Sequence, residues 1–218
     1  MVMKKLLVLA TIVALSVSAF AAANLQITEI YSGLSGDDGT ADWFEITNYG
    51  DSAWDLTASG LYYDDDSQAW SKADPITGIT SIAAGESVIV MVSGSASDID
   101  TMRDLWNLSA SIQVGIVDGA GIGNDATDGA TLFDSLQTIL DYAEYDWPTD
   151  GLLCRTIDFT VDPAAPTTPG VNGAYHSDMF YNSVYGCDIC LVGTPGFVPE
   201  PATMALLGLG ALVLRRRK

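Results

Sequence analysis

Basic residues are scarce in this 218-residue chain, which has nine Lys and Arg against 28 Asp and Glu. Residues 24–198 keep only Lys72, Arg103 and Arg155 as cations beside 27 acids, which gives this segment a net charge of −24. So negative a surface repels phosphate backbones and anionic lipids. We therefore expect no nucleic-acid partner, and contact with a membrane only through a terminal tail.

Residues for nucleophilic catalysis are equally sparse. His176 is the only histidine, and no Gly-x-Ser-x-Gly elbow accompanies it, so a hydrolytic triad is not expected. Glu29 and Glu45 lie on neighbouring predicted strands, the minimum for glycosidase chemistry, but the simpler interpretation is a pair of ordinary strand residues. We predict no enzyme and no catalytic residue. A secreted carboxylate-dependent hydrolase is the alternative.

The cysteine count is low and odd. Cys187 and Cys190 form a Cys-x-x-Cys pair, whereas Cys154 stands apart. In an exported chain we expect one disulfide among these three, and the sequence leaves every pairing open. A Cys₃His zinc site that adds His176 is a weaker alternative because its spacing is loose.

The N-terminus has the layout of a secretory signal. A basic Met1–Lys5 region precedes the 12-residue apolar run Leu6–Val17, and small residues follow up to Ala23. The apolar run is too short for a membrane span and is followed by small-x-small cleavage patterns. We predict a signal peptide over residues 1–23, removed by signal peptidase.

The C-terminus carries a second signal. The box Pro199, Glu200, Pro201 precedes the 13-residue apolar stretch Ala202–Leu214, and the cations Arg215, Arg216, Arg217 and Lys218 close the chain. A helix of that length reaches only about 20 Å of a roughly 30 Å hydrocarbon core. Residues 198–218 resemble the PEP-CTERM sorting signal. The resemblance implies an exosortase partner, a short transmembrane helix that anchors the chain transiently, and delivery to the outer surface or extracellular matrix. A plain C-terminal anchor is the alternative.

Between the two signals the chain is typical of an all-β domain. Short runs rich in β-branched and aromatic residues alternate with Gly, Asp and Ser clusters. The predicted strands are Leu25–Tyr31, Asp42–Tyr49, Leu61–Tyr63, Ser87–Val92, Ile112–Val117 and Thr138–Tyr145. In the second strand Phe44 and Ile46 share the face we expect in the core, with Trp43, Glu45 and Thr47 on the other face. One helix is predicted over Asp98–Leu108, capped by Ser97 or Asp98 and packed on the end of the sandwich.

The order of several short motifs in this region is similar to that of the lamin-tail domain. They are Ile27–Ile30, Asp42–Asn48, Trp54–Leu56, Ala84–Val90, Leu132–Asp134, Ile139–Asp141 with Tyr145, and Thr168–Asn172. The resemblance implies an immunoglobulin-like β-sandwich over residues 24–172 and an adhesion or targeting role. Residues 173–197 are either a Cys-containing extension or the last strands of that sandwich.

Acidic loops are candidate calcium sites, because carboxylates among glycines supply the oxygen ligands that calcium prefers. None has EF-hand spacing, and ordinary polar loops are the simpler interpretation. The candidate ligands are Asp37, Asp38, Asp42, Asp64, Asp65, Asp66, Asp118, Asp125 and Asp128.

Aromatic residues beside these loops raise a carbohydrate-binding alternative. Trp43, Tyr62, Tyr63 and Trp70 are the candidate platform, although core packing explains most of them. Taken together, the sequence predicts a non-enzymatic surface or matrix protein with an adhesive, biofilm or structural role, in which calcium assistance and an extracellular polymer partner are hypotheses.

Overall fold

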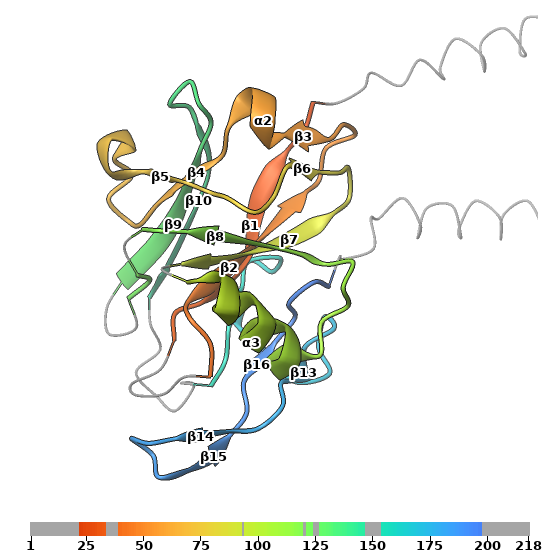
Figure 1. Cartoon of the computed structure of the whole chain (residues 1–218), viewed down its shortest axis with the longest axis vertical. Coiled ribbons are helices and arrows are strands. Elements are labelled where there is room, and N and C mark those ends of the chain that lie inside the picture. Colours follow the sequence, from red (N-terminus) through yellow and green to blue (C-terminus); the bar gives the residue numbers. More distant parts are fainter. Residues whose placement is uncertain are drawn as a thin grey trace, which may run out of the picture.

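The computed structural model describes residues 22–33, 39–92, 94–119, 121–123, 127–146 and 154–197. This part of the chain is mostly β-strand, as the sequence predicts (Figure 1). Residues 1–21 and 198–218, which hold the predicted signal peptide and the sorting tail, lie outside it. Among the described residues no helix is long and apolar enough to cross a bilayer.

Two sheets form the body of the domain. The larger has the strand order β12-β11-β1-β2-β7-β8, and the smaller has the order β10-β9-β4-β5. The strands of the larger sheet are β1 Leu25–Tyr31, β2 Trp43–Asn48, β7 Ser87–Val92, β8 Gln113–Val117, β11 Ile157–Asp158 and β12 Ala165–Pro166. Those of the smaller sheet are β4 Tyr62–Asp64, β5 Asp74–Pro75, β9 Thr127–Phe133 and β10 Ile139–Asp146. All six predicted strands are present within two residues of their expected ends.

The main core lies between the two sheets. Phe44 and Ile46 of β2 enter it, as the alternation predicted, beside Val88 and Val90 of β7 and Leu132 of β9. Phe44 stacks on Tyr63 with ring centroids 5.1 Å apart. Three small elements accompany these sheets. They are the strand pair β3 Trp54–Asp55 with β6 Ser81–Ile82, the short helix α2 Leu56–Ser59 and the 3₁₀ turn η1 Trp70–Lys72.

The opposite face of the six-stranded sheet is also covered, which the strand pattern did not predict. Helix α3, Ala96–Trp106, connects β7 to β8, the one parallel pair among the named strands. Parallel neighbours require such a crossover, and a helix usually supplies it. Met102, Leu105 and Trp106 of α3 pack against Trp43 and other outer-face residues. The helix therefore lies on the face of the sheet rather than at the end of the sandwich.

The start of α3 differs from the prediction by two residues. Ser95 is the N-cap, and Asp98, expected as a cap, is the third helical residue. Its carboxylate accepts a 2.6 Å hydrogen bond from the Ser95 backbone N–H in a capping box. The helix ends at Asn107, which has a left-handed conformation with φ 48°. A serine two residues before the predicted cap competes for that role, so the sequence alone does not fix the start.

Residues 173–197 form an extension rather than strands of the two main sheets. They contain two strand pairs of their own, and the β14–β15 pair is a hairpin that projects from the body (Figure 1). The pairs are β13 Tyr175–His176 with β16 Val192–Gly193, and β14 Phe180–Asn182 with β15 Cys187–Ile189. A parallel bridge between Arg155 and Val192 joins the extension to the chain entering β11.

Candidate functional site

Three acidic side chains form a row across the outer face of the six-stranded sheet. Glu29 on β1 is the register partner of Asp158 on β11 and of Glu45 on β2. Directly opposed residues on adjacent strands have side chains about 5 Å apart. Glu29, Glu45 and Asp158 are 0%, 1% and 7% exposed, respectively. We call these three residues the carboxyl row.

Glu29 is held by donors from two distant parts of the chain. The Thr156 hydroxyl and the Thr194 backbone N–H donate to Oε1, the latter at 2.7 Å. The Thr194 hydroxyl donates to Oε2 at 2.9 Å. Gly193 lies so close that a Cβ there would stand 2.9 Å from Glu29 Oε1, so only glycine fits. The segment after Gly193 therefore lies directly on the carboxyl row.

Glu45 repeats this arrangement one strand further on. The Thr28 hydroxyl donates to its Oε1 at 2.8 Å, and the Gly196 backbone N–H donates to its Oε2 at 2.6 Å. Thr28 also contacts Thr47, which bonds the Ser87 hydroxyl at 2.6 Å. The two glutamates thus bind the same C-terminal segment through backbone N–H groups, two residues apart.

Burial dominates the electrostatics of the carboxyl row. Desolvation raises the pKa of Glu29 to about 7, although the hydrogen bonds from Thr156 and Thr194 oppose the shift. Desolvation, followed by repulsion from Glu29, raises the pKa of Glu45 well above its ordinary value. The Arg155 guanidinium donates to the Thr167 carbonyl at 3.1 Å. Near neutral pH, Glu29 and Glu45 are therefore protonated to a greater extent than exposed glutamates would be.

A cavity of about 490 Å³ adjoins the row, but the two glutamates do not line it. Its walls include Tyr49, Thr160, Asn172 and Phe197, with Asp158 as the acidic group. Asp158 is itself engaged by Thr160, whose backbone N–H donates to it at 2.7 Å. Glycosidase chemistry requires two carboxyl groups flanking a bound sugar. Glu29 and Glu45 instead satisfy the donors of a covering segment, which is a structural use of both groups.

The acidic loops converge at one end of the sandwich. Asp128, Asp65 and Asp42 each raise the pKa of the buried Tyr63 hydroxyl, after desolvation as the main cause. Asp65 caps a local turn by accepting the Ser67 N–H at 2.9 Å, whereas Asp42 accepts the N–H of Ile122, 80 positions further along the chain, at 3.0 Å.

The remaining calcium candidates are placed as follows. Asp64 accepts from Ala69 N–H at 2.6 Å and Asp128 from Gly129 N–H at 2.7 Å, whereas Asp66 and Asp118 are exposed. Within the described ranges no group of three His, Cys, Asp or Glu side chains is arranged to hold a metal ion. Asp37, Asp38 and Asp125 lie outside those ranges.

The cysteines gather around the extension as free thiols. Cys190 Sγ lies 3.3 Å from His176 Nδ1, and Cys154 is half-buried nearby with a pKa raised by desolvation and then by Cys190. Cys187 begins strand β15, and Cys190 directly follows its last residue. Three steps along an extended chain separate their Cα atoms by roughly 10 Å, whereas a disulfide needs its Cα atoms within about 7 Å. The Cys-x-x-Cys motif is therefore unsuited to closing on itself in this conformation.

The four aromatic residues of the carbohydrate-binding alternative do not form one exposed platform. Trp43 and Tyr63 are buried on opposite faces of the fold. Tyr62 and Trp70 are half-buried and pack edge to face, 4.7 Å apart, with Phe133 against Trp70 at 5.8 Å. Tyr62 of β4 and Phe133 of β9 are paired strand residues of the four-stranded sheet, and η1 brings Trp70 against both rings. Each of these rings is therefore at least partly used in packing against another ring.

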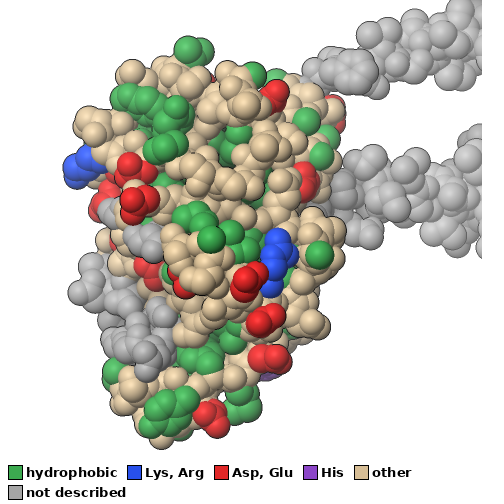
Figure 2. All heavy atoms as spheres, in the orientation of Figure 1, with side chains coloured by type: hydrophobic (Ala, Val, Ile, Leu, Met, Phe, Trp, Pro, Cys, Tyr) green, Lys and Arg blue, Asp and Glu red, His purple; other side chains and the backbone are tan. Residues whose placement is uncertain are grey.

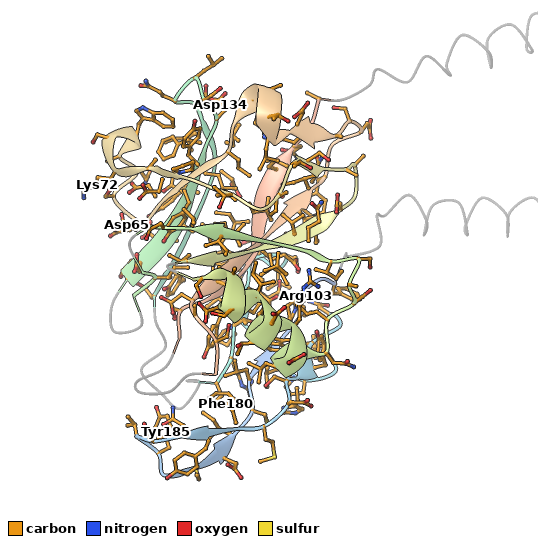
Figure 3. The ribbon with its side chains drawn as sticks, viewed as in Figure 1. Asp65, Lys72, Arg103, Asp134, Phe180 and Tyr185 are labelled. Carbon is orange, nitrogen blue, oxygen red and sulfur yellow. The ribbon has the colours of Figure 1, made fainter. Side chains whose placement is uncertain are left out.

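A group of exposed hydrophobic side chains that includes two tyrosines lies instead on and beside the β14–β15 hairpin, which the sequence analysis did not single out. Figure 2 shows hydrophobic side chains gathered at this end of the molecule. Met179, Tyr181, Val184 and Tyr185 are 68%, 59%, 59% and 41% exposed. In Figure 3 Tyr185 lies on the hairpin, and Phe180 lies between the hairpin and the body. The Tyr-rich composition of this segment was the only signal in the sequence.

Comparison with known protein families matches the C-terminal end of the chain. The PEP-CTERM protein-sorting motif matches residues 197–218. The chain is therefore an exported protein that is sorted by an exosortase and located at the surface or outside the cell. No curated protein and no solved structure matches the chain. The lamin-tail resemblance has no family match to support it.

Proposed function

We propose that this is a non-enzymatic surface or extracellular-matrix protein that adheres to an extracellular polysaccharide through the β14–β15 hairpin. The observation that carries this is the exposure of Met179, Tyr181, Val184 and Tyr185 on one projecting element. Exposed apolar groups concentrated in this way mark interaction sites. Tyrosine rings stack on sugar faces while their hydroxyls remain hydrated. The scarcity of cations argues for a neutral or cationic polymer.

Two further features agree with this proposal. The two-sheet body is compatible with the immunoglobulin-like, lamin-tail-like interpretation, in which such domains serve adhesion. The hydrolase alternative loses its main support, because Glu29 and Glu45 lie beneath Thr194 and Gly196 and offer no room for substrate. An activity screen with Glu45→Gln as the control variant tests that alternative directly.

Replacing Tyr181 and Tyr185 together by Ser is expected to weaken binding to the producing cell's exopolysaccharide at least tenfold, since stacking contributes about 1 kcal/mol per ring. The measurement is co-sedimentation of the exported protein with purified polymer. Leu136→Ser is the matched control, because Leu136 is 82% exposed on the β9–β10 turn, away from the hairpin. Equal binding by the double variant and wild type would refute the hairpin as the adhesive element.

Calcium is expected to assist this role little. Asp42, Asp64, Asp65 and Asp128 already accept backbone N–H groups, so millimolar calcium should change the melting temperature by less than about 2 °C. A site filled at 100 times its Kd would add about 2.7 kcal/mol and raise the melting temperature by roughly 5 to 10 °C. Thermal melts in calcium and in excess chelator measure this. A rise of the larger size, absent with magnesium, would show that the acidic loops form a true calcium site.

A further inference from the structure

The segment that the carboxyl row holds is the one that leads into the sorting motif. Gly196, bound to Glu45 at 2.6 Å, precedes Pro199 of the Pro-Glu-Pro box by three residues. Residues 194–197 belong to the described fold, and Phe197 is also the first residue of the matched sorting motif. The segment that the two glutamates hold therefore continues directly into that motif.

The hold on this segment is distributed over several residues. Both the backbone N–H and the hydroxyl of Thr194 donate hydrogen bonds to Glu29. The Phe197 N–H donates to the Thr194 carbonyl at 2.8 Å and closes a turn around Pro195. The Phe197 ring packs closely on Gly173, because a Cβ on Gly173 would stand only 2.7 Å from a ring carbon of Phe197. Residues 194–197 are thus docked through backbone, side-chain and ring contacts rather than by one bond.

The start of the described chain lies at the same end of the sandwich. The Tyr49 N–H donates to the Asn24 carbonyl at 2.8 Å, and Tyr49 lines the same cavity as Phe197. Tyr49 therefore connects the residue next to the predicted signal-peptide junction with the residues that enter the sorting motif.

We propose that Glu29 and Glu45 retain residues 194–197 as a gate on sorting, so that tail removal requires this segment to leave the sandwich. The proposal rests on sorting by an exosortase. One common way for a protein to recognise a peptide segment is in an extended form, through its main-chain groups. In residues 194–197 two such groups, the N–H of Thr194 and the N–H of Gly196, are already bound by Glu29 and Glu45. Cleavage of a segment that opens transiently follows the population of the open form. The strength of the two glutamate contacts then sets how often the box becomes accessible.

Thr194→Val tests the gate because it removes one hydroxyl donor to Glu29 with almost no change in shape. We expect the Gly196 amide to exchange its hydrogen about tenfold faster, since one hydrogen bond to a buried carboxyl group is lost. Tail removal, followed by pulse-chase in cells that contain the exosortase, should accelerate by a similar factor. The exchange measurement uses the full chain from cells that lack the enzyme.

Thr131→Val is the matched control. Thr131 is also buried, with 0% exposure against 8% for Thr194. Its hydroxyl donates to the Asp65 carbonyl at 2.8 Å, and it lies on β9 of the other sheet. It should lower the melting temperature similarly and leave both rates unchanged. Unchanged exchange in Thr194→Val would overturn retention by the carboxyl row. Faster exchange without faster tail removal would overturn the gate. Absence of tail removal even in the wild type would instead overturn the sorting on which the proposal rests.

Discussion

The free energy of unfolding is expected to fall by about 3 kcal/mol between pH 4.5 and pH 7 because of Glu29 alone. Its pKa is about 7 in the folded chain and 4.5 as the ordinary value. Within this window the folded state keeps a proton that the unfolded state releases. Stability from Glu29 is therefore fully present below pH 4.5 and is lost as the pH rises through 7. Glu45 acts in the same direction, because desolvation and repulsion from Glu29 raise its pKa as well.

Glu29→Gln isolates this contribution. The amide carries no charge and retains an oxygen to accept from Thr156 and Thr194, so stability should become much less dependent on pH in this window. Urea denaturation at closely spaced pH values measures the slope. Glu144→Gln is the control, because Glu144 is exposed on β10 and shares only the general effect of the acidic surface. A Glu29→Gln variant with the wild-type slope would show that this carboxyl group is not the titrating one.

Trp106→Ala is expected to reduce the free energy of unfolding by about 3 to 5 kcal/mol, the usual loss for a buried aromatic. Trp106 is fully buried and packs edge to face on Trp43 at 6.1 Å and on Tyr175 at 5.5 Å. Trp106 thus connects helix α3 with the six-stranded sheet and with the extension. Gly193 of the extension also lies against it, since a Cβ there would stand 3.0 Å from the Trp106 ring. Its removal leaves a cavity where three segments meet.

Denaturation followed by near-ultraviolet circular dichroism measures this loss. Trp106→Phe keeps one ring and should be affected less, which preserves the test if the alanine variant does not fold. Trp70→Ala provides a comparison on the other sheet, where a half-buried ring should contribute less. Equal losses for Trp106→Ala and Trp70→Ala would contradict the central position assigned to Trp106.

Alternation in β2 correctly predicted which residues share a face but not what covers that face. Phe44 and Ile46 enter the main core as expected. Glu45 and Thr47, on the other face of the strand, are equally buried. Gly196 of the extension covers Glu45, and the Thr47 hydroxyl lies between those of Thr28 and Ser87. The covering residues Thr194 and Gly196 lie 165 and 151 positions from the glutamates they bind. Periodicity within a strand contains no information about contacts at such separations.

The aromatic residues show the same limit. Trp70 and Tyr62 lie near acidic loops in the sequence, which favoured a binding platform, yet each is the packing partner of the other. The hairpin that does expose aromatic side chains has few local strand signals, since its two strands are only three residues long. Short strands are defined by their pairing and not by their composition.

The sequence by itself determined the features that reside in contiguous residues. These are the sorting motif at residues 197–218, the acidic charge, the strand content and the location of strands such as β1 and β7. Only the tertiary structure decided that Asp158, Glu29 and Glu45 form a buried row and that the segment before the sorting motif lies on it. The physical reason is that burial and the resulting pKa shifts depend on which distant segments exclude water from a side chain.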